Sequence, residues 1–135
     1  MVFDTFSEYE NKTYYLNSGI WGGVNLCCKE NKISKKENDK KIRIIVAGGE
    51  RIQKNNIEVC KAIEILSNNL EKDIELKICG RKYYQENLFE KYRHSIYVGM
   101  LPYKEFCKEL EKSDIFILNS EVESFGLSPV DALLC

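Results

Sequence analysis

Two acidic side chains bracket a short glycine-containing turn in the stretch ESFGLSPVDALLC, near the end of the chain. Glu123 stands before Phe125, Gly126 and Leu127, and Asp131 follows about one helical turn later. A helix that begins there would point its first backbone amides outward, where they can bind an anion or a sugar hydroxyl. Carboxylates beside those amides can accept hydrogen bonds from several hydroxyls of one ligand. The pattern therefore predicts a site for a polyol that carries a phosphate, such as a nucleotide sugar.

The same residues allow a purely structural interpretation. The stretch SPVD, Ser128 to Asp131, matches the S-x-x-[DE] capping box, with Pro129 at the first helical position. Asp131 would then stabilise the start of a helix and bind no ligand. Spacing alone leaves both interpretations open.

A second group of candidate residues lies in the turn AGGERIQKNN. Gly48 and Gly49 allow the backbone to turn tightly and to approach a ligand, and Arg51 and Lys54 add two cations. An arginine fork together with a mobile lysine ammonium suits a diphosphate. A glycine turn with two exposed basic residues is the structural alternative. The turn is neither a G-x-G-x-x-G dinucleotide fingerprint nor a Walker A loop.

The elements that must position these turns alternate between strand and helix patterns. Strands are predicted in IRIIVAGG (42–49), IELKICG (74–80), SIYVGM (95–100) and DIFILNS (114–120). Helices are predicted in NNIEVCKAIEILSNNL (55–70), where the Asn55-Asn56 pair can cap the start, in YYQENLFEKY (83–92), in PYKEFCKELEKS (102–113), and from Leu127 onward.

This alternation predicts an α/β fold, a Rossmann-like doubly wound parallel sheet with helices on both faces. Ligands bind such sheets at the carboxyl ends of the strands, so the turns after the strands are the expected site. Residues 1–41 do not follow the repeat and are predicted to be an N-terminal extension with a charged linker. Residues 42–135 are the predicted binding domain.

Composition narrows the functional classes. The chain has 135 residues and a net charge of -1, so nothing indicates a general attraction to nucleic acid. It contains neither a transmembrane span nor a signal peptide pattern, and a cytoplasmic protein is expected. The six cysteines include no C-x-x-C pair, which disfavours a zinc site and predicts reduced cysteines packed as small hydrophobes. The single histidine, His94, is not expected to be catalytic.

The order of these segments resembles the donor-binding half of the retaining family 4 glycosyltransferases, also called group 1, which have the GT-B fold. The stretch ESFGLSPVDALLC is similar to their E-x7-E segment, AGGERIQKNN occupies the place of their Gly-Arg…Lys phosphate turn, and IYVGMLPYKEFCKELEKSDIFILNS is similar to the segment that precedes the motif. The resemblance covers about residues 42–135. It implies a metal-free transferase without a cofactor, acting on a UDP-, GDP- or ADP-sugar in polysaccharide biosynthesis.

The resemblance also implies roles for individual residues. Glu123 would be the catalytic residue facing the donor sugar, and Asp131 would take the place of the glutamate that binds the ribose hydroxyls. The donor-binding set would comprise Gly48, Gly49, Arg51 and Lys54 at the diphosphate, Met100 and Leu101 at the base, and Ser124, Phe125, Gly126 and Leu127 at the sugar and distal phosphate. Asp131 is one methylene shorter than the usual Glu, and Arg51 is closer to Lys54 than usual.

A GT-B enzyme has a second, acceptor-binding domain that 41 leading residues cannot form. The chain is therefore expected to be a truncated fragment of an enzyme that transfers a hexosyl group to a glycan or lipid-linked acceptor, inactive alone. The full-length enzyme is expected in the cytoplasm, with the inner face of the membrane as an alternative position. The strand order is expected to start 3-2-1-4, leaving an exposed apolar edge at 115–118. A non-catalytic nucleotide-binding module and another Rossmann-like domain are the alternatives.

Overall fold

The computed structural model describes residues 41–70, 72–84, 88–123 and 126–135. Within them the elements are β1 (Lys41–Ala47), the single 3₁₀ turn η2 (Ile52–Lys54), α2 (Asn56–Ser67), β2 (Asp73–Cys79), β3 (Ser95–Gly99), α3 (Tyr103–Lys112), β4 (Ile115–Ile117) and α4 (Leu127–Leu134). None of the helices in the described ranges is both long and apolar enough to cross a membrane.

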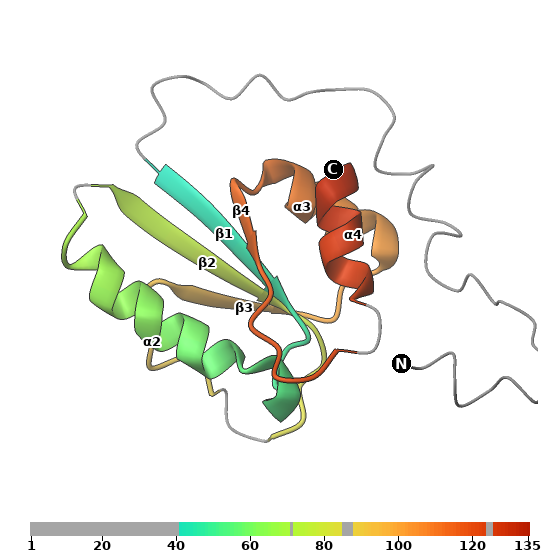
Figure 1. Cartoon of the computed structure of the whole chain (residues 1–135). Helices are drawn as coiled ribbons and strands as arrows, with labels where there is room; N and C mark the ends of the chain where they lie inside the picture. The colour runs from blue at the N-terminus through green and yellow to red at the C-terminus, as the bar shows by residue number, and fades with distance from the viewer. Residues whose placement is uncertain (1–40, 71, 85–87, 124–125) are drawn as a thin grey trace, which may run out of the picture.

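The four strands form one parallel sheet in the order β3-β2-β1-β4, as predicted (Figure 1). β1 is central because its β-branched side chains are buried on both faces of the sheet: Ile44, Ile45 and Val46 are at most 4% exposed. It pairs with β2 along its whole length, from Lys41 opposite Asp73 to Ala47 opposite Cys79. The alternation of strands and helices thus predicted a parallel sheet, while the order of its strands came from the family resemblance.

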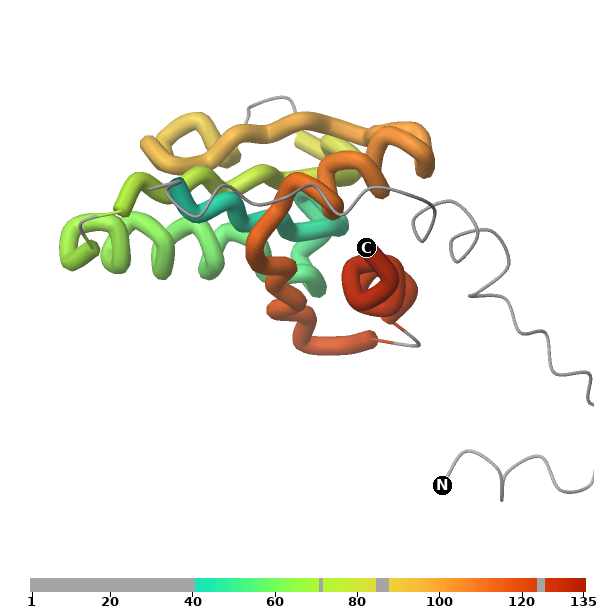
Figure 2. The backbone as a smooth tube through the Cα atoms, turned by 90° about the horizontal axis from the view of Figure 1, so that it is seen from above, coloured from blue at the N-terminus to red at the C-terminus, as the bar shows by residue number. Residues whose placement is uncertain are grey.

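Helices cover both faces of the sheet, which confirms the doubly wound arrangement (Figures 1 and 2). Successive residues of a strand point to opposite faces, so Ile44 and Val46 pack in the core under α2. Ile45 lies in the second core, where it packs with Leu110 of α3 and Ala132 of α4.

Three of the cysteines pack in the two cores like small apolar side chains. Cys60 in α2, Cys79 in β2 and Cys107 in α3 are at most 4% exposed. Burial raises the pKa of the Cys79 thiol to about 12. The thiol is therefore protonated at neutral pH, and packing is sufficient to explain its presence.

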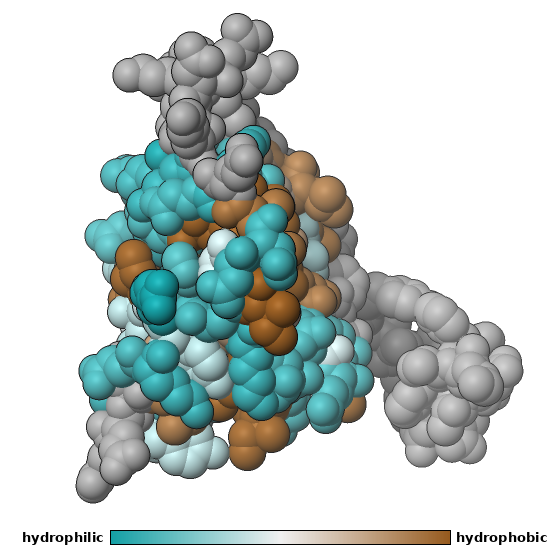
Figure 3. Space-filling model, turned by 90° about the vertical axis from the view of Figure 1, so that its left-hand side faces the viewer, coloured by the Kyte–Doolittle hydropathy of each residue, from teal (hydrophilic) through white to brown (hydrophobic). Residues whose placement is uncertain are grey.

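The outer surface is mixed in character. Figure 3 shows a face on which hydrophilic residues surround several separate apolar patches. Ile65 and Leu66 near the end of α2, and Leu70 beyond it, are exposed apolar residues, and Ile65 is 67% exposed. Scattered apolar residues of this kind are normal on soluble domains.

The predicted helix over 83–92 is wrong for the residues that the structure describes. Residues 88–91 form a turn, and residues 85–87 lie outside the described ranges. Phe89 and Tyr92 are 1% and 8% exposed, and the Tyr92 amide donates to the Phe89 carbonyl at 3.0 Å. A helix this short is marginal by itself, and burial of both aromatic rings in the core under α2 decides the local conformation instead.

The predicted asparagine cap of α2 is also wrong. Asn55 takes a left-handed conformation at the helix start, and its side chain makes no capping hydrogen bond. The side-chain amide of Asn56 instead donates to the backbone carbonyls of Ala47 at 3.2 Å and Gly49 at 2.9 Å. Asn56 therefore fastens α2 to the turn after β1 rather than capping the helix.

Candidate functional site

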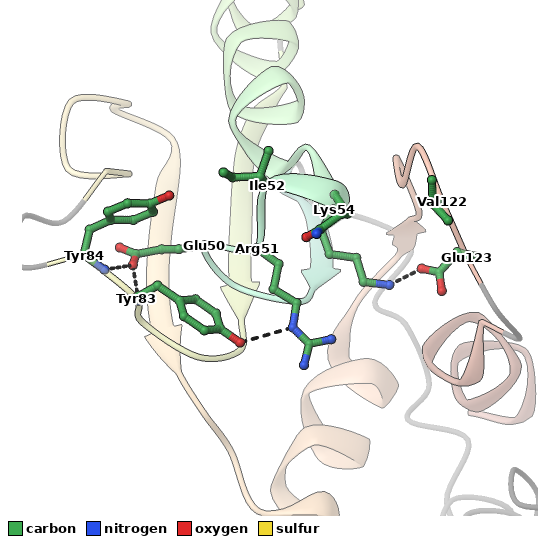
Figure 4. A pocket seen from close by; sticks show the side chains of 9 residues that line it. Glu50, Arg51, Ile52, Lys54, Tyr83, Tyr84, Val122 and Glu123 are labelled. Atoms are coloured by element: carbon green, nitrogen blue, oxygen red, sulfur yellow. Dashed lines mark hydrogen bonds and ion pairs between the residues drawn. The ribbon is translucent and has the colours of Figure 1, made fainter.

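A hollow of about 680 Å³ opens at the carboxyl ends of the strands, as expected for a parallel sheet (Figure 4). It lies between the turn after β1, the loop after β2 and the segment after β4. We call it the cation hollow because two basic side chains reach into it. Its lining residues are Glu50, Arg51, Ile52, Gln53, Lys54, Tyr83, Tyr84, Val122 and Glu123.

Lys54 and Glu123 form an ion pair across the cation hollow (Figure 4). The two side chains are 17% and 25% exposed, and the Ser120 hydroxyl donates to the same Glu123 oxygen at 2.8 Å. The hydrogen bonds from Lys54 and Ser120 lower the pKa of the Glu123 carboxyl below its ordinary value. Glu123 is therefore a carboxylate near neutral pH.

Gly48 makes room for the lysine of this pair. Its φ is +102°, and a Cβ atom built there would lie 2.3 Å from Cγ of Lys54. No other residue type allows that contact, so the glycine lets the alkyl chain of Lys54 pass over the turn toward Glu123. The predicted backbone approach of Gly48 to a ligand stays a prediction.

Gly49 joins the turn after β1 to the loop after β2. Its amide donates to the Cys79 carbonyl at 2.8 Å, and a Cβ atom there would lie 2.4 Å from the Arg81 carbonyl oxygen. The close approach that this glycine allows is therefore to the protein's own backbone.

Arg51 reaches the cation hollow from the same turn. Its Nε donates to the Tyr83 hydroxyl at 3.2 Å, which raises the pKa of the guanidinium and lowers the pKa of the phenol. The charge of the Glu123 carboxylate also acts on the Arg51 guanidinium and raises its pKa further.

A second hollow, of about 360 Å³, adjoins the first at Arg51. Met100 and Leu101 after β3 form part of its wall, together with Gly48 and Tyr103. Met100 is 67% exposed. The predicted base-contacting pair thus lies one hollow away from Lys54 and Glu123, with Arg51 lining both.

The predicted ribose contact of Asp131 stays a prediction, and the structure gives its carboxylate a partner within the protein. Its Oδ1 accepts a hydrogen bond from the Tyr103 hydroxyl at 2.9 Å, and Tyr103 lines the second hollow. Burial, and then hydrogen bonds with Cys107 and Asp131, raise the pKa of Tyr103. The Asp131 carboxylate is therefore one hydrogen bond away from a residue that lines the second hollow.

The capping box at the start of α4 does not form. Gly126 precedes the helix, Leu127 is its first residue, and there is no side-chain capping hydrogen bond. Ser128 and Pro129 are therefore the second and third helical residues, which places the serine too late to cap. The bond between Asp131 and the Tyr103 hydroxyl is thus a structural role that the spacing did not predict.

The structure brings the predicted residues of the three turns together. Arg51, Lys54 and Glu123 share the cation hollow, while Gly48, Met100 and Leu101 line the second. Leu127 is 43% exposed at the start of α4. The predictions for Ser124 and Phe125 lie outside the described residues.

Sequence reasoning missed Glu50, Tyr83 and Tyr84, which also line the cation hollow. The signal for the two tyrosines was the stretch GRKYY, which follows β2 at the same edge as the other turns, whereas Glu50 lies within the turn AGGERIQKNN that had already been singled out. Assignment of the tyrosines to a helix hides that signal, because it moves them from the turn to a covering element.

One comparison with known proteins is informative. The family profile described as "Glycosyl transferases group 1" matches residues 29–135. No curated protein matches the chain. The match includes every described element, and it begins before β1.

Proposed function

This chain belongs to the group 1 glycosyltransferases, and from that premise we propose that residues 42–135 bind the nucleoside diphosphate sugar donor. The enzyme transfers the hexosyl group to a hydroxyl of a glycan or a lipid-linked acceptor. The observation that carries the proposal is the convergence of Arg51, Lys54 and Glu123 on one hollow at the carboxyl ends of the strands.

The two cations suit the diphosphate of the donor. When the bond between the anomeric carbon and the phosphate oxygen breaks, the leaving nucleoside diphosphate gains negative charge. Arg51 can bind it through two parallel N–H groups, and Lys54 adds a mobile point charge. Such preplaced charges stabilise a leaving group where it forms, which is the role that a metal ion has in other transferases.

Glu123 suits the sugar side of the same bond. Positive charge develops at the anomeric carbon as the leaving group departs, and an ionised carboxylate nearby stabilises it. The lowered pKa of Glu123 keeps the group ionised. The acceptor oxygen then bonds to the anomeric carbon on the face that the diphosphate leaves, its proton passes to the departing phosphate, and the configuration is retained.

The second hollow suits the nucleoside. Met100 and Leu101 offer apolar contact to a base, and the Tyr103–Asp131 pair offers oxygen atoms to ribose hydroxyls. In this arrangement the Tyr103 hydroxyl, which is hydrogen-bonded to Asp131, reaches the second hollow in place of the aspartate. It can therefore make the ribose contact for which the aspartate side chain is one methylene short. Arg51 at the junction then meets the diphosphate between the two ends of the donor.

The acceptor is proposed to come from a second domain. The cation hollow is open to solvent, and exposed Ile52 and Val122, 74% and 72% accessible, stand on its rim. A site open on one side leaves the donor sugar hydrated, which weakens binding and allows no precise placement of an acceptor. The described domain alone is therefore expected to bind the nucleoside diphosphate weakly and to transfer no sugar.

Calorimetric titration of the chain with UDP, GDP and ADP tests this proposal. We expect one of them to bind in the millimolar range or better, and the matching nucleoside to bind more weakly. Lys54→Met should reduce the diphosphate affinity about fivefold or more, because one charge-assisted contact is lost.

Lys61→Met is the matched control, since Lys61 pairs with Glu58 on the surface of α2 and does not line the hollow. Absence of binding by all three diphosphates at millimolar concentration would contradict the proposal. Equal losses in both variants would show that general charge, and not the hollow, attracts the ligand.

A further inference from the structure

A chain of hydrogen bonds leads from a buried carboxylate to Arg51 (Figure 4). Glu50 Oε2 accepts from the backbone amides of Tyr83 at 2.5 Å and Tyr84 at 2.8 Å. The Tyr83 hydroxyl in turn accepts from Arg51 Nε at 3.2 Å. The carboxylate thus holds the backbone of the residue whose side chain holds the arginine.

Glu50 is an unusual residue to bury. It is 5% exposed, and its Oε1 is buried without a hydrogen bond among the described residues. A buried carboxylate is costly unless its oxygens are satisfied, and within the described ranges only Oε2 has hydrogen-bond partners. An apolar residue at this position would avoid that desolvation cost, so the two backbone amides that Glu50 binds are the evident reason for a glutamate here.

The backbone around Glu50 fixes the distance between the two turns. The Glu50 amide donates to the Arg81 carbonyl at 3.1 Å, beside the bond from Gly49 to Cys79. A Cβ atom at Gly80 would lie 2.3 Å from the Gly49 nitrogen, so the two turns are in direct backbone contact. The Tyr83 side chain therefore starts from a backbone that cannot move independently of Arg51.

The contact with Tyr83 determines which nitrogens of Arg51 remain available. The phenol occupies Nε, and the two terminal nitrogens point away from Tyr83 (Figure 4). An exposed arginine has many rotamers, and binding a phosphate requires that most of them be given up. Arg51 lines both hollows, so its direction decides whether it meets the junction between them.

We propose that Tyr83 and Glu50 are positioning residues of the donor site: Glu50 fixes the loop after β2, and Tyr83 holds Arg51 with its terminal nitrogens directed at the diphosphate. This inference rests on the proposed function. It assigns no contact with the donor to Glu50, and it makes the phenol a partner of the arginine rather than of the substrate.

Titration of the full chain with the nucleoside diphosphate that binds best tests the inference. Tyr83→Phe should weaken binding about three- to tenfold, which corresponds to the loss of one hydrogen bond that preorganises the arginine. It should leave the affinity for the matching nucleoside unchanged. In an Arg51→Met background, Tyr83→Phe should have no further effect, because the phenol acts only through the arginine.

Two further variants separate positioning from folding. Glu50→Gln keeps an acceptor oxygen for the two amides and should retain most of the affinity, whereas Glu50→Ala should lose as much as Tyr83→Phe. The NMR signal of Arg51 Nε–H should be protected from exchange in the wild-type chain and lose that protection in Tyr83→Phe. Tyr92→Phe, on the α2 side of the sheet, is the control and should change neither measurement.

The outcomes distinguish this inference from the proposed function. A wild-type chain that binds no diphosphate overturns the proposed function and the inference with it. Wild-type binding that is unaffected by Tyr83→Phe, or weakened equally in the presence and absence of Arg51, overturns the inference alone.

Discussion

At the scale of residues, the ion pair between Lys54 and Glu123 couples the site to the stability of the fold. The pKa of Glu123 is lowered from its ordinary value of 4.5 in the folded protein, first by the hydrogen bond from Lys54. The stability that this interaction contributes is therefore fully present above pH 4.5 and is lost as the pH falls through the lowered folded-state pKa.

Urea denaturation of the wild-type chain and of Glu123→Gln at a series of pH values measures this contribution. The difference in unfolding free energy should be constant near neutral pH and should shrink toward zero below the ordinary glutamate pKa. Glu121→Gln, an exposed change on the same segment, is the matched control and should show a smaller dependence. A difference that grows on acidification would contradict the pairing.

The places of the residues after strands were enough to single out the turns that hold Arg51, Lys54 and Glu123, whereas their assignment to one site came from the family resemblance. The bond between Tyr103 and Asp131 was not predictable, because it joins residues 28 positions apart. It depends on how α3 packs against α4, which no local pattern encodes. The role of Glu50 was hidden for a similar reason: its partners are amides on another turn.

At the scale of elements, the turn after β1 combines an unusual backbone conformation with a close side-chain contact. Gly48 has a φ of +102° and leaves no room for a Cβ atom beside Lys54. Gly99, after β3, has a φ of +79° but has no atom within 4 Å of the position of a Cβ. Both glycines therefore have a positive φ, but only at Gly48 would an added Cβ atom meet a neighbouring side chain.

Gly48→Ala should reduce the unfolding free energy by about 1 kcal/mol more than Gly99→Ala, in addition to a backbone cost of about 1–2 kcal/mol for each. Denaturant titration of both variants provides the comparison. Gly48→Ala should also weaken diphosphate binding, because the added methyl group displaces the Lys54 alkyl chain. Equal destabilisation by the two changes would show that the Lys54 side chain moves away from the added methyl group without a measurable free-energy cost.

The predictability of the elements followed the strength of their periodicity. The β-branched segments of β1 and β2 and the amphipathic pattern of α3 were placed to within a few residues. The segment 83–92 failed because its aromatic residues satisfy helical spacing and also suit a turn with two buried rings. Long-range packing under α2, rather than local preference, settles such an ambiguity.

At the scale of the whole molecule, the described sheet ends at β4, which among the described strands pairs only with β1. Ile115 and Leu118 are 46% and 43% exposed there. An apolar edge strand without lysine or proline offers unpaired backbone groups to a second copy of the chain. The expected exposure over 115–118 holds only at its two ends, because Phe116 and Ile117 are half-buried against the two cores.

The chain is therefore expected to self-associate through β4. Ile115→Lys should shift sedimentation toward the monomer, because a charged edge residue disfavours strand pairing between molecules. Ile65→Lys, which changes an exposed apolar residue of α2 in the same way, is the control and should have little effect. A wild-type chain that stays monomeric at high concentration would contradict the prediction.

The Lys54–Glu123 pair also means that the lysine of the site has a counter-ion from the protein itself. An inorganic anion that binds the lysine must separate the ion pair and leave Glu123 with the hydrogen bond from Ser120 but without the lysine, so the cost of separation weakens the binding of the anion. A donor brings a phosphate for the ammonium and sugar hydroxyls for the carboxylate, and it can exchange both partners at once. Under the proposed function, selectivity against the abundant small anions of the cell is therefore expected to arise from this exchange of partners.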